Sequence, residues 1–258
     1  MRLSGLQIVI PYHSQWDLLQ DAIRSCSEQA VLIVDDSFEG LPESIDGVEV
    51  LRTPGGLGFS KAANLGLAHS ERLGVQWTLV LNDDAALKPG AIEALWQALE
   101  RHPRAEALGP VLEGPSGVDS AGICLSPRTA RMVQRTDVPE RDRVVMALSG
   151  ACLLVRSKWR FSETFSHSME DVELGIRIRD AGGESVLVPN ARCWHLGGAT
   201  VPRDSPRATR EAVKGHLRLV GTSRSKRLLV VSYALCQVLK EGPRLRRMQA
   251  VWRGWREA

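Results

Sequence analysis

The sequence has no CxxC pair, no long uninterrupted apolar run, and no apolar segment behind a basic start. Its five cysteines are odd in number and widely spaced, which indicates free thiols in a reducing cytoplasm and argues against a zinc site. The longest apolar run, Leu228 to Leu239, contains Ser232 and Gln237 and is too short to span a bilayer. We see no secretion signal and expect a cytoplasmic location.

Two familiar phosphate-binding motifs are also missing. The segment Pro54-Gly55-Gly56-Leu57-Gly58 does not match GxGxxG in a useful register, and it lacks the Lys-Ser/Thr of a P-loop. A tight turn before a helix explains this segment as well as a ligand-binding loop does, and both interpretations stay open.

The composition is that of an ordinary globular protein with an unevenly distributed charge. The 258 residues, 43% hydrophobic and 24% charged, suffice for one large α/β domain or two small ones. From Arg207 onward there are thirteen Lys and Arg against three Glu, which gives this part a charge of about +10. Because the net charge of the whole chain is only +3, the rest of the chain is acidic. A basic tail on an acidic body predicts an anionic partner for the tail.

Aliphatic runs and amphipathic segments alternate through the first hundred residues. Strands are predicted at 6–10, 30–34, 48–51 and 75–81, and helices at 16–26, 60–73 and 89–101. We expect Pro11 to stop the first strand and Ser14 to cap the first helix. This pattern predicts βαβ units and a mostly parallel sheet covered on both faces.

Polar residues follow these strands where ligands bind in such a sheet. Asp35-Asp36 and Asn82-Asp83-Asp84 each come directly after an aliphatic run. Adjacent carboxylates repel unless a cation lies between them, and oxygen ligands suit Mg²⁺ or Mn²⁺. Alternatively, Asp83 or Asp84 caps a following helix.

From about residue 105 the alternation ends and a mixed or antiparallel half is predicted. Strands are expected at 107–112, 120–125, 131–134 and 185–189, with 131–134 pairing with 120–125, a surface loop at 136–143, and an apolar stretch at 145–155. Acids crowd the start of a predicted helix at 169–181, so Glu170 and Asp171 are either caps or functional groups. His195, beside Trp194, is by itself more typical of a structural residue than of a ligand.

Taken together, short motifs in this order resemble family-2 glycosyltransferases with the GT-A fold, especially rhamnosyltransferase-like members. The resemblance covers residues 8 to about 198. The matching segments are Val9-Ile10-Pro11, Val34-Asp35-Asp36-Ser37, 56–64, Leu81-Asn82-Asp83-Asp84, Ser149-Gly150-Ala151-Cys152, 170–174 and Trp194-His195. It implies a GT-A catalytic domain at 1–201, with a nucleotide-binding half at 1–104 and an acceptor half at 105–201, followed by a basic helical extension at 202–258.

The resemblance also implies roles for individual residues. The family's DxD motif aligns with Asn82-Asp83-Asp84, so Asp84 is expected to bind Mg²⁺ or Mn²⁺, and His195 to add a ligand. The family's catalytic base maps to Asp171, with Glu170 in reserve, which implies inversion at the anomeric carbon. The donor, a nucleoside-diphosphate sugar, is expected to lie against Pro11, Tyr12, Asp35, Asp36, Gly58, Lys61, Asn64, Asn82 and Asp83, and the sugars against Ser149, Gly150, Ala151 and Trp194.

The expected acceptor is a saccharide or a lipid-linked sugar in cell-surface polysaccharide or glycolipid synthesis, and no nucleic-acid partner is expected. Arg and Trp interleave between Arg244 and Trp255, which predicts either an interfacial helix on an anionic membrane or a helix packed on the catalytic domain. Two rivals are a non-catalytic nucleotide-sugar-binding protein and a sugar nucleotidyltransferase. The second is disfavoured because Pro11-Tyr12-His13-Ser14-Gln15 is not the expected glycine-rich basic loop.

Overall fold

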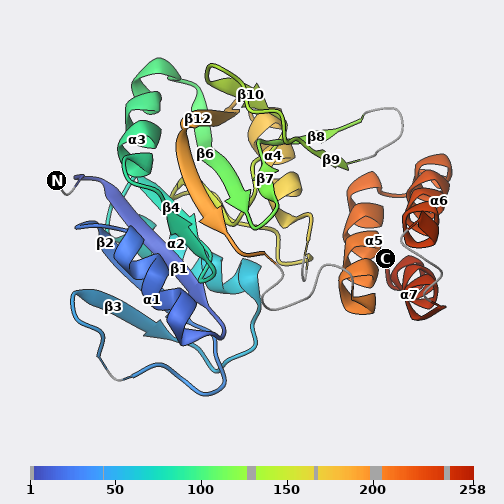
Figure 1. Ribbon diagram of the computed structural model, residues 1–258, viewed down its shortest axis with the longest axis horizontal. Helices are drawn as coiled ribbons and strands as arrows, with labels where there is room; N and C mark the ends of the chain where they lie inside the picture. Colours follow the sequence, from blue (N-terminus) through green and yellow to red (C-terminus); the bar gives the residue numbers. More distant parts are fainter. Residues whose placement is uncertain (1–2, 43, 127–131, 166–167, 198–204, 241–244) are drawn as a thin grey trace.

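A computed structural model describes residues 3–42, 44–126, 132–165, 168–197, 205–240 and 245–258 (Figure 1). Most strands form one sheet in the order β10-β12-β6-β11-β4-β1-β2-β3, with β5 added to β12 and β7 added to β6. Their bounds are β1 Leu6–Tyr12, β2 Ala30–Asp35, β3 Val48–Arg52, β4 Trp77–Leu81, β5 Ala85–Leu87, β6 Ala105–Gly114, β7 Gly117–Ser120, β10 Arg143–Val145, β11 Cys152–Arg156 and β12 Glu184–His195. β8 (Ile123–Leu125) and β9 (Met132–Gln134) form a separate pair.

The first half of the sheet is parallel, as the βαβ pattern predicted. β1 pairs in parallel with both β2 and β4, and β2 with β3. The second half is mixed, as expected, because β11 runs antiparallel between β4 and β6 while β12 is parallel to β6. The segments predicted to be the nucleotide-binding and acceptor halves therefore share one continuous sheet.

Helices cover both faces of the sheet. On one face, α1 (Trp16–Ser25) and α3 (Ala91–Arg101) bury Leu19 and Leu95 against Ile8 and Leu79. On the other face lie α2 (Phe59–Arg72) and α4 (Glu170–Asp180), whose buried side chains join a cluster with Val80. Successive strand residues alternate between the two faces, which is why near-continuous aliphatic runs make up these strands.

The described C-terminal helices form a third group at one end of the molecule, beyond α4 and the β8–β9 pair (Figure 1). They are α5 (Pro206–Val220), α6 (Arg224–Lys240) and α7 (Leu245–Glu257), and they share a core that includes Val213, Val230 and Val251. Leu219 of α5 also packs into a cluster with Met169, the N-cap residue of α4, and with Val172 of α4. Helices were predicted in this region, within the basic extension at 202–258, of which residues 202–204 and 241–244 lie outside the described residues.

Several local predictions were wrong. β1 continues through Pro11 to Tyr12, and Gln15, not Ser14, occupies the N-cap of α1 without a side-chain cap bond. The expected strand at 120–125 is split, since β7 pairs with β6 and β8 with β9, and Gly122 at φ +94° lies between them. The strand expected at 185–189 extends to His195.

Candidate active site

The ends of three parallel strands bring the predicted nucleotide residues to one edge. Tyr12 lies opposite Asp35 in the β1–β2 register, and the N–H of His13 donates to Asp83 Oδ2 at 3.1 Å. Burial, and then the charges of Asp83 and Asp35, raise the pKa of Tyr12 above its ordinary value. The first turn after β1 is thereby linked to the acidic segment after β4.

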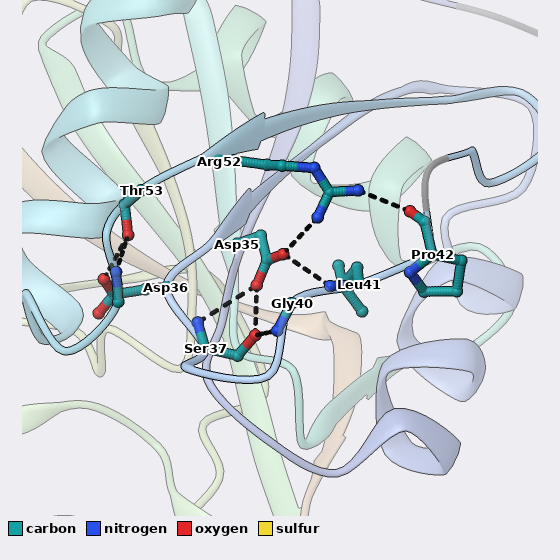
Figure 2. Close-up of polar contacts among 9 residues, drawn as sticks. Asp35, Asp36, Ser37, Gly40, Leu41, Pro42, Arg52 and Thr53 are labelled. Atoms are coloured by element: carbon teal, nitrogen blue, oxygen red, sulfur yellow. Dashed lines mark hydrogen bonds and ion pairs between the residues drawn. The ribbon is translucent and has the colours of Figure 1, made fainter.

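Asp35 and Asp36 are both buried and hydrogen-bonded to the protein itself (Figure 2). Asp36 accepts from Thr53 Oγ1 at 2.7 Å, Leu57 N–H at 2.9 Å and Gly58 N–H at 2.8 Å, which holds the glycine loop against the end of β2. Asp35 accepts from the Arg52 guanidinium at 3.0 Å and from Ser37 and Leu41. Their contacts with a nucleotide stay a prediction.

A strand, not a helix, follows the acidic segment. β5 begins at Ala85, and α3 begins only at Ala91 after Gly90. The alternative that Asp83 or Asp84 caps the following helix is therefore wrong. Burial raises the pKa of Asp83 to about 6, helped by the charge of Asp84 and opposed by the N–H of His13.

Asp84 faces His195 because β5 pairs with the end of β12. His195 lies opposite Ala85 in this pairing, and its Nε2 lies 3.3 Å from Asp84 Oδ1. Burial would raise the pKa of Asp84, but the hydrogen bond and charge of His195 outweigh it and hold that pKa below its ordinary value. The imidazole is thus held by the residue that the resemblance paired with it.

Asp119 is a third member of this group that the sequence did not reveal. It lies on β7, and its Oδ2 is 3.6 Å from Nδ1 of His195. Burial lowers the pKa of His195, but Asp119 and Asp84 outweigh it and raise the pKa to about 9. No motif surrounds Asp119; only the pairing of β7 with β6 brings it here.

The Asp84–His195 pair fits a hard divalent ion. Cis ligands of an ion with bond lengths of about 2.1 Å lie about 3 Å apart, and these two ligand atoms are 3.3 Å apart. Asn82, Asp84 and His195 line one hollow. The Oδ1 atom of Asn82 is buried without a hydrogen-bond partner among the described residues. The described residues contain no cluster of three or more His, Cys, Asp or Glu suited to a metal.

Glu170 and Asp171 lie at the start of α4, partly exposed. Asp171 accepts from the N–H groups of Gly150 at 3.2 Å and Val172 at 2.8 Å, and Glu170 accepts from Ser168 N–H at 2.7 Å. Burial raises the pKa of both carboxyls, that of Glu170 to about 7 with help from the charge of Asp171. Elevated pKa values suit a group that must take up a proton near neutral pH.

The loop Ser149–Ala151 connects the two groups of acids. Gly150 donates its N–H to Asp171, while the carbonyl of Ala151 accepts the N–H of Asn82 at 2.9 Å. This loop was predicted to face the sugars. One hydrogen-bonded turn thus links the base candidates to the segment that carries Asp84.

Three predicted residues lie elsewhere. Lys61 and Asn64 line a second hollow of about 660 Å³, where Asn64 bonds the backbone N–H and C=O of Phe161 at 2.8 and 2.9 Å. Asn64 therefore ties α2 to the segment after β11. Trp194 is 39% exposed and, as the strand neighbour of His195, points to the opposite face.

The hollow beside Asp84 and His195 contains residues that sequence reasoning missed. It measures about 510 Å³ and is lined by Asn82, Asp83, Asp84 and His195 on one side and by residues of α5, α6 and α7 on the other. The helical extension therefore forms a wall of the candidate active site.

Comparison with solved structures identifies the fold. The chain superposes on GalNAc-T7, crystallised with UDP, GalNAc and Mn²⁺, with a TM-score of 0.67 at 16% identity, covering 96% of this chain and 54% of that one. It also matches S. aureus TarS 1–349 in complex with UDP-GlcNAc, with a TM-score of 0.59 at 13% identity, covering 95% and 79%. The fold is GT-A, with a mixed central sheet flanked by helices.

Sequence comparison gives the family. The model of glycosyl transferase family 2 matches residues 7–160. An N-acetylglucosaminyl-diphospho-decaprenol L-rhamnosyltransferase of Mycobacterium tuberculosis is 34% identical in an alignment 213 residues long that covers 68% of this chain and 69% of that protein. The chain belongs to glycosyl transferase family 2, and it is a glycosyltransferase of the rhamnosyltransferase-like kind.

Proposed function

We propose that this glycosyltransferase moves L-rhamnose from a nucleoside-diphosphate donor to a sugar hydroxyl on a diphospho-lipid, with inversion and with a divalent ion. The observation that carries the proposal is the link between two acidic groups: Ser149–Ala151 bonds both Asp171 and the segment of Asp84. The named activity of the Mycobacterium tuberculosis relative supports the choice of sugar and acceptor.

Asp84 and His195, with Asn82, would hold Mg²⁺ or Mn²⁺. When bound, the ion supplies positive charge that stabilises the leaving nucleoside diphosphate. The carboxylate of Asp119 lies 3.6 Å from the far nitrogen of the imidazole, and through this ion-pair contact it would orient His195 toward Asp84. Asp119 and Asp84 raise the pKa of His195 to about 9, so the imidazole would have to lose its proton in order to hold an ion.

Asp171 accepts the proton of the attacking hydroxyl, and Glu170 is the reserve candidate. A positioned base typically contributes about 10²–10⁴-fold to the rate. The N–H groups of Gly150 and Val172 fix the carboxylate of Asp171. Direct attack assisted by a single base inverts the anomeric carbon.

We also propose that the extension works at an anionic membrane surface, on the cytoplasmic side. Among the described residues, no helix has the length and hydrophobicity of a membrane span. The outer face of α7 instead exposes Trp252 and Trp255, whose ring centroids lie 5.2 Å apart. A hollow of about 450 Å³ between α5 and α7 is lined by Arg207, Arg210, Arg246 and Arg253, which suits lipid phosphates.

Transfer assays with nucleoside-diphosphate sugars, with and without EDTA, test the function. We expect hydrolysis of, or transfer from, an L-rhamnose donor that requires Mg²⁺ or Mn²⁺. Activity that is equal with and without EDTA would contradict the proposed role of the divalent ion. Inactivity toward every donor would contradict the proposed glycosyl transfer.

Membrane binding is tested separately by flotation with anionic vesicles. The double variant Arg246→Gln with Arg253→Gln should float less than the parent, whereas Arg246→Lys with Arg253→Lys should float like the parent.

A further inference from the structure

The 510 Å³ hollow has a chemically mixed lining. Asn82, Asp84 and His195 belong to it, and α6 contributes the apolar Val230, Ala234 and Val238 together with the polar Tyr233 and Gln237. Its volume is typical of small-molecule sites, which are mostly apolar with a few polar groups that fix orientation. A ligand that fills this hollow therefore needs a polar part near the acids and an apolar part between the helices.

Helix α5 packs closely against the segment just before α4. A Cβ on Gly215 of α5 would lie 2.9 Å from the carbonyl oxygen of Ser168 and 3.1 Å from Cγ of Met169. Ser168 and Met169 both line the hollow, and both have positive φ, +131° and +73°. Such backbone strain at the residues just before Glu170 is typical of functional sites. The hollow and the base candidates are thus held in one rigid arrangement.

A buried guanidinium lies in the same hollow. Arg247 of α7 is 8% exposed, and its Nε donates to Thr209 Oγ1 of α5 at 3.0 Å; both residues line the hollow. His216 of α5, also 8% exposed, is a further nitrogen-bearing side chain of the lining. Guanidinium groups bind phosphate in a bidentate manner, and burial strengthens such contacts.

We propose that this hollow, here called the acceptor cavity, binds an isoprenoid diphosphate that carries the acceptor sugar. The diphosphate contacts Arg247, the first isoprene units lie against Val230, Ala234 and Val238, and the sugar reaches the acids. This inference rests on the proposed function.

The test compares two acceptors with the same sugar, one linked to an isoprenoid diphosphate and one a short alkyl glycoside. Ala234→Trp adds bulk to the apolar part of the lining, and Ser232→Trp adds the same bulk on the exposed side of α6. We expect Ala234→Trp to raise the KM for the isoprenoid acceptor by about 10-fold or more, an energy near that of one displaced apolar side chain. The KM for the donor and metal-dependent donor hydrolysis should not change, and Ser232→Trp should match the parent.

Variants of Arg247 test the binding of the diphosphate separately from the binding of the lipid. Arg247→Gln should raise the KM for the diphosphate acceptor by about 10-fold or more while leaving that for the alkyl glycoside unchanged, and Arg247→Lys should recover part of the loss. If Ala234→Trp does not fold, Ala212→Leu narrows the same hollow from α5. The acceptor cavity would be overturned if the parent enzyme used both acceptors equally well. It would also be overturned if neither Ala234→Trp nor Arg247→Gln changed the KM for the isoprenoid acceptor. Failure of the proposed function looks different: the parent would hydrolyse no donor.

Discussion

Replacing Glu170 by Gln should stabilise the protein in a pH-dependent way. Burial and the charge of Asp171 raise the pKa of Glu170 from 4.5 to about 7. Between those pH values the folded protein holds a proton that the unfolded chain has released, so the free energy of unfolding falls as the pH rises through this window. Fully ionised, the carboxylate costs up to about 3 kcal/mol. Gln removes that charge and keeps an oxygen that can accept from Ser168 N–H.

Urea unfolding at pH 4.5 and pH 8 measures this effect. We expect Glu170→Gln to be nearly neutral at pH 4.5 and more stable than the parent at pH 8 by up to about 3 kcal/mol. Glu173→Gln is the control, because Glu173 is on the same helix but pairs with Arg177 at 2.7 Å. Removing the charge of Glu173 should therefore not raise the free energy of unfolding. An equal effect of Glu170→Gln at both pH values would refute the reasoning, since it would show that no ionisation penalty exists.

Three further outcomes follow from the site. Asp84→Asn should weaken Mn²⁺-dependent binding of nucleoside diphosphate by about 10-fold or more while leaving binding in EDTA unchanged, as read by calorimetry. Asp119→Asn should weaken the same binding by about 10–100-fold, because it removes the carboxylate 3.6 Å from His195; an unchanged affinity would mean that Asp119 does not orient the imidazole. Gly215→Val should destabilise the chain by about 1–3 kcal/mol in thermal unfolding, because its side chain meets the carbonyl of Ser168. Stability equal to the parent would show that α5 can move away.

Local sequence patterns predicted the parallel half of the sheet and the place of the acids. Asp84 and His195 are far apart in sequence, and their pairing followed only from the resemblance; the β5–β12 register then confirmed that they meet. Asp119 could not be predicted, because no local pattern marks it and its position depends on the pairing of β7 with β6.

The wall made by the extension was also beyond sequence reasoning. Basic, amphipathic helices are compatible both with a membrane surface and with packing on a domain. The close approach of Gly215 to Ser168 shows that α5 packs on the catalytic half, while Trp252 and Trp255 stay exposed on α7. The packing of α5 does not decide between the two alternatives for the helix at 244–255, and membrane binding of α7 stays a prediction.

Asp171→Asn tests the central claim most directly. In one preparation, the rate of L-rhamnose transfer and the affinity for nucleoside diphosphate with Mn²⁺ would be measured against the parent. The proposed role of Asp171 predicts a rate lower by about 10² or more with an affinity close to that of the parent, because the base acts on the acceptor and not on the nucleotide. A rate like that of the parent would contradict the assignment of Asp171 as the base.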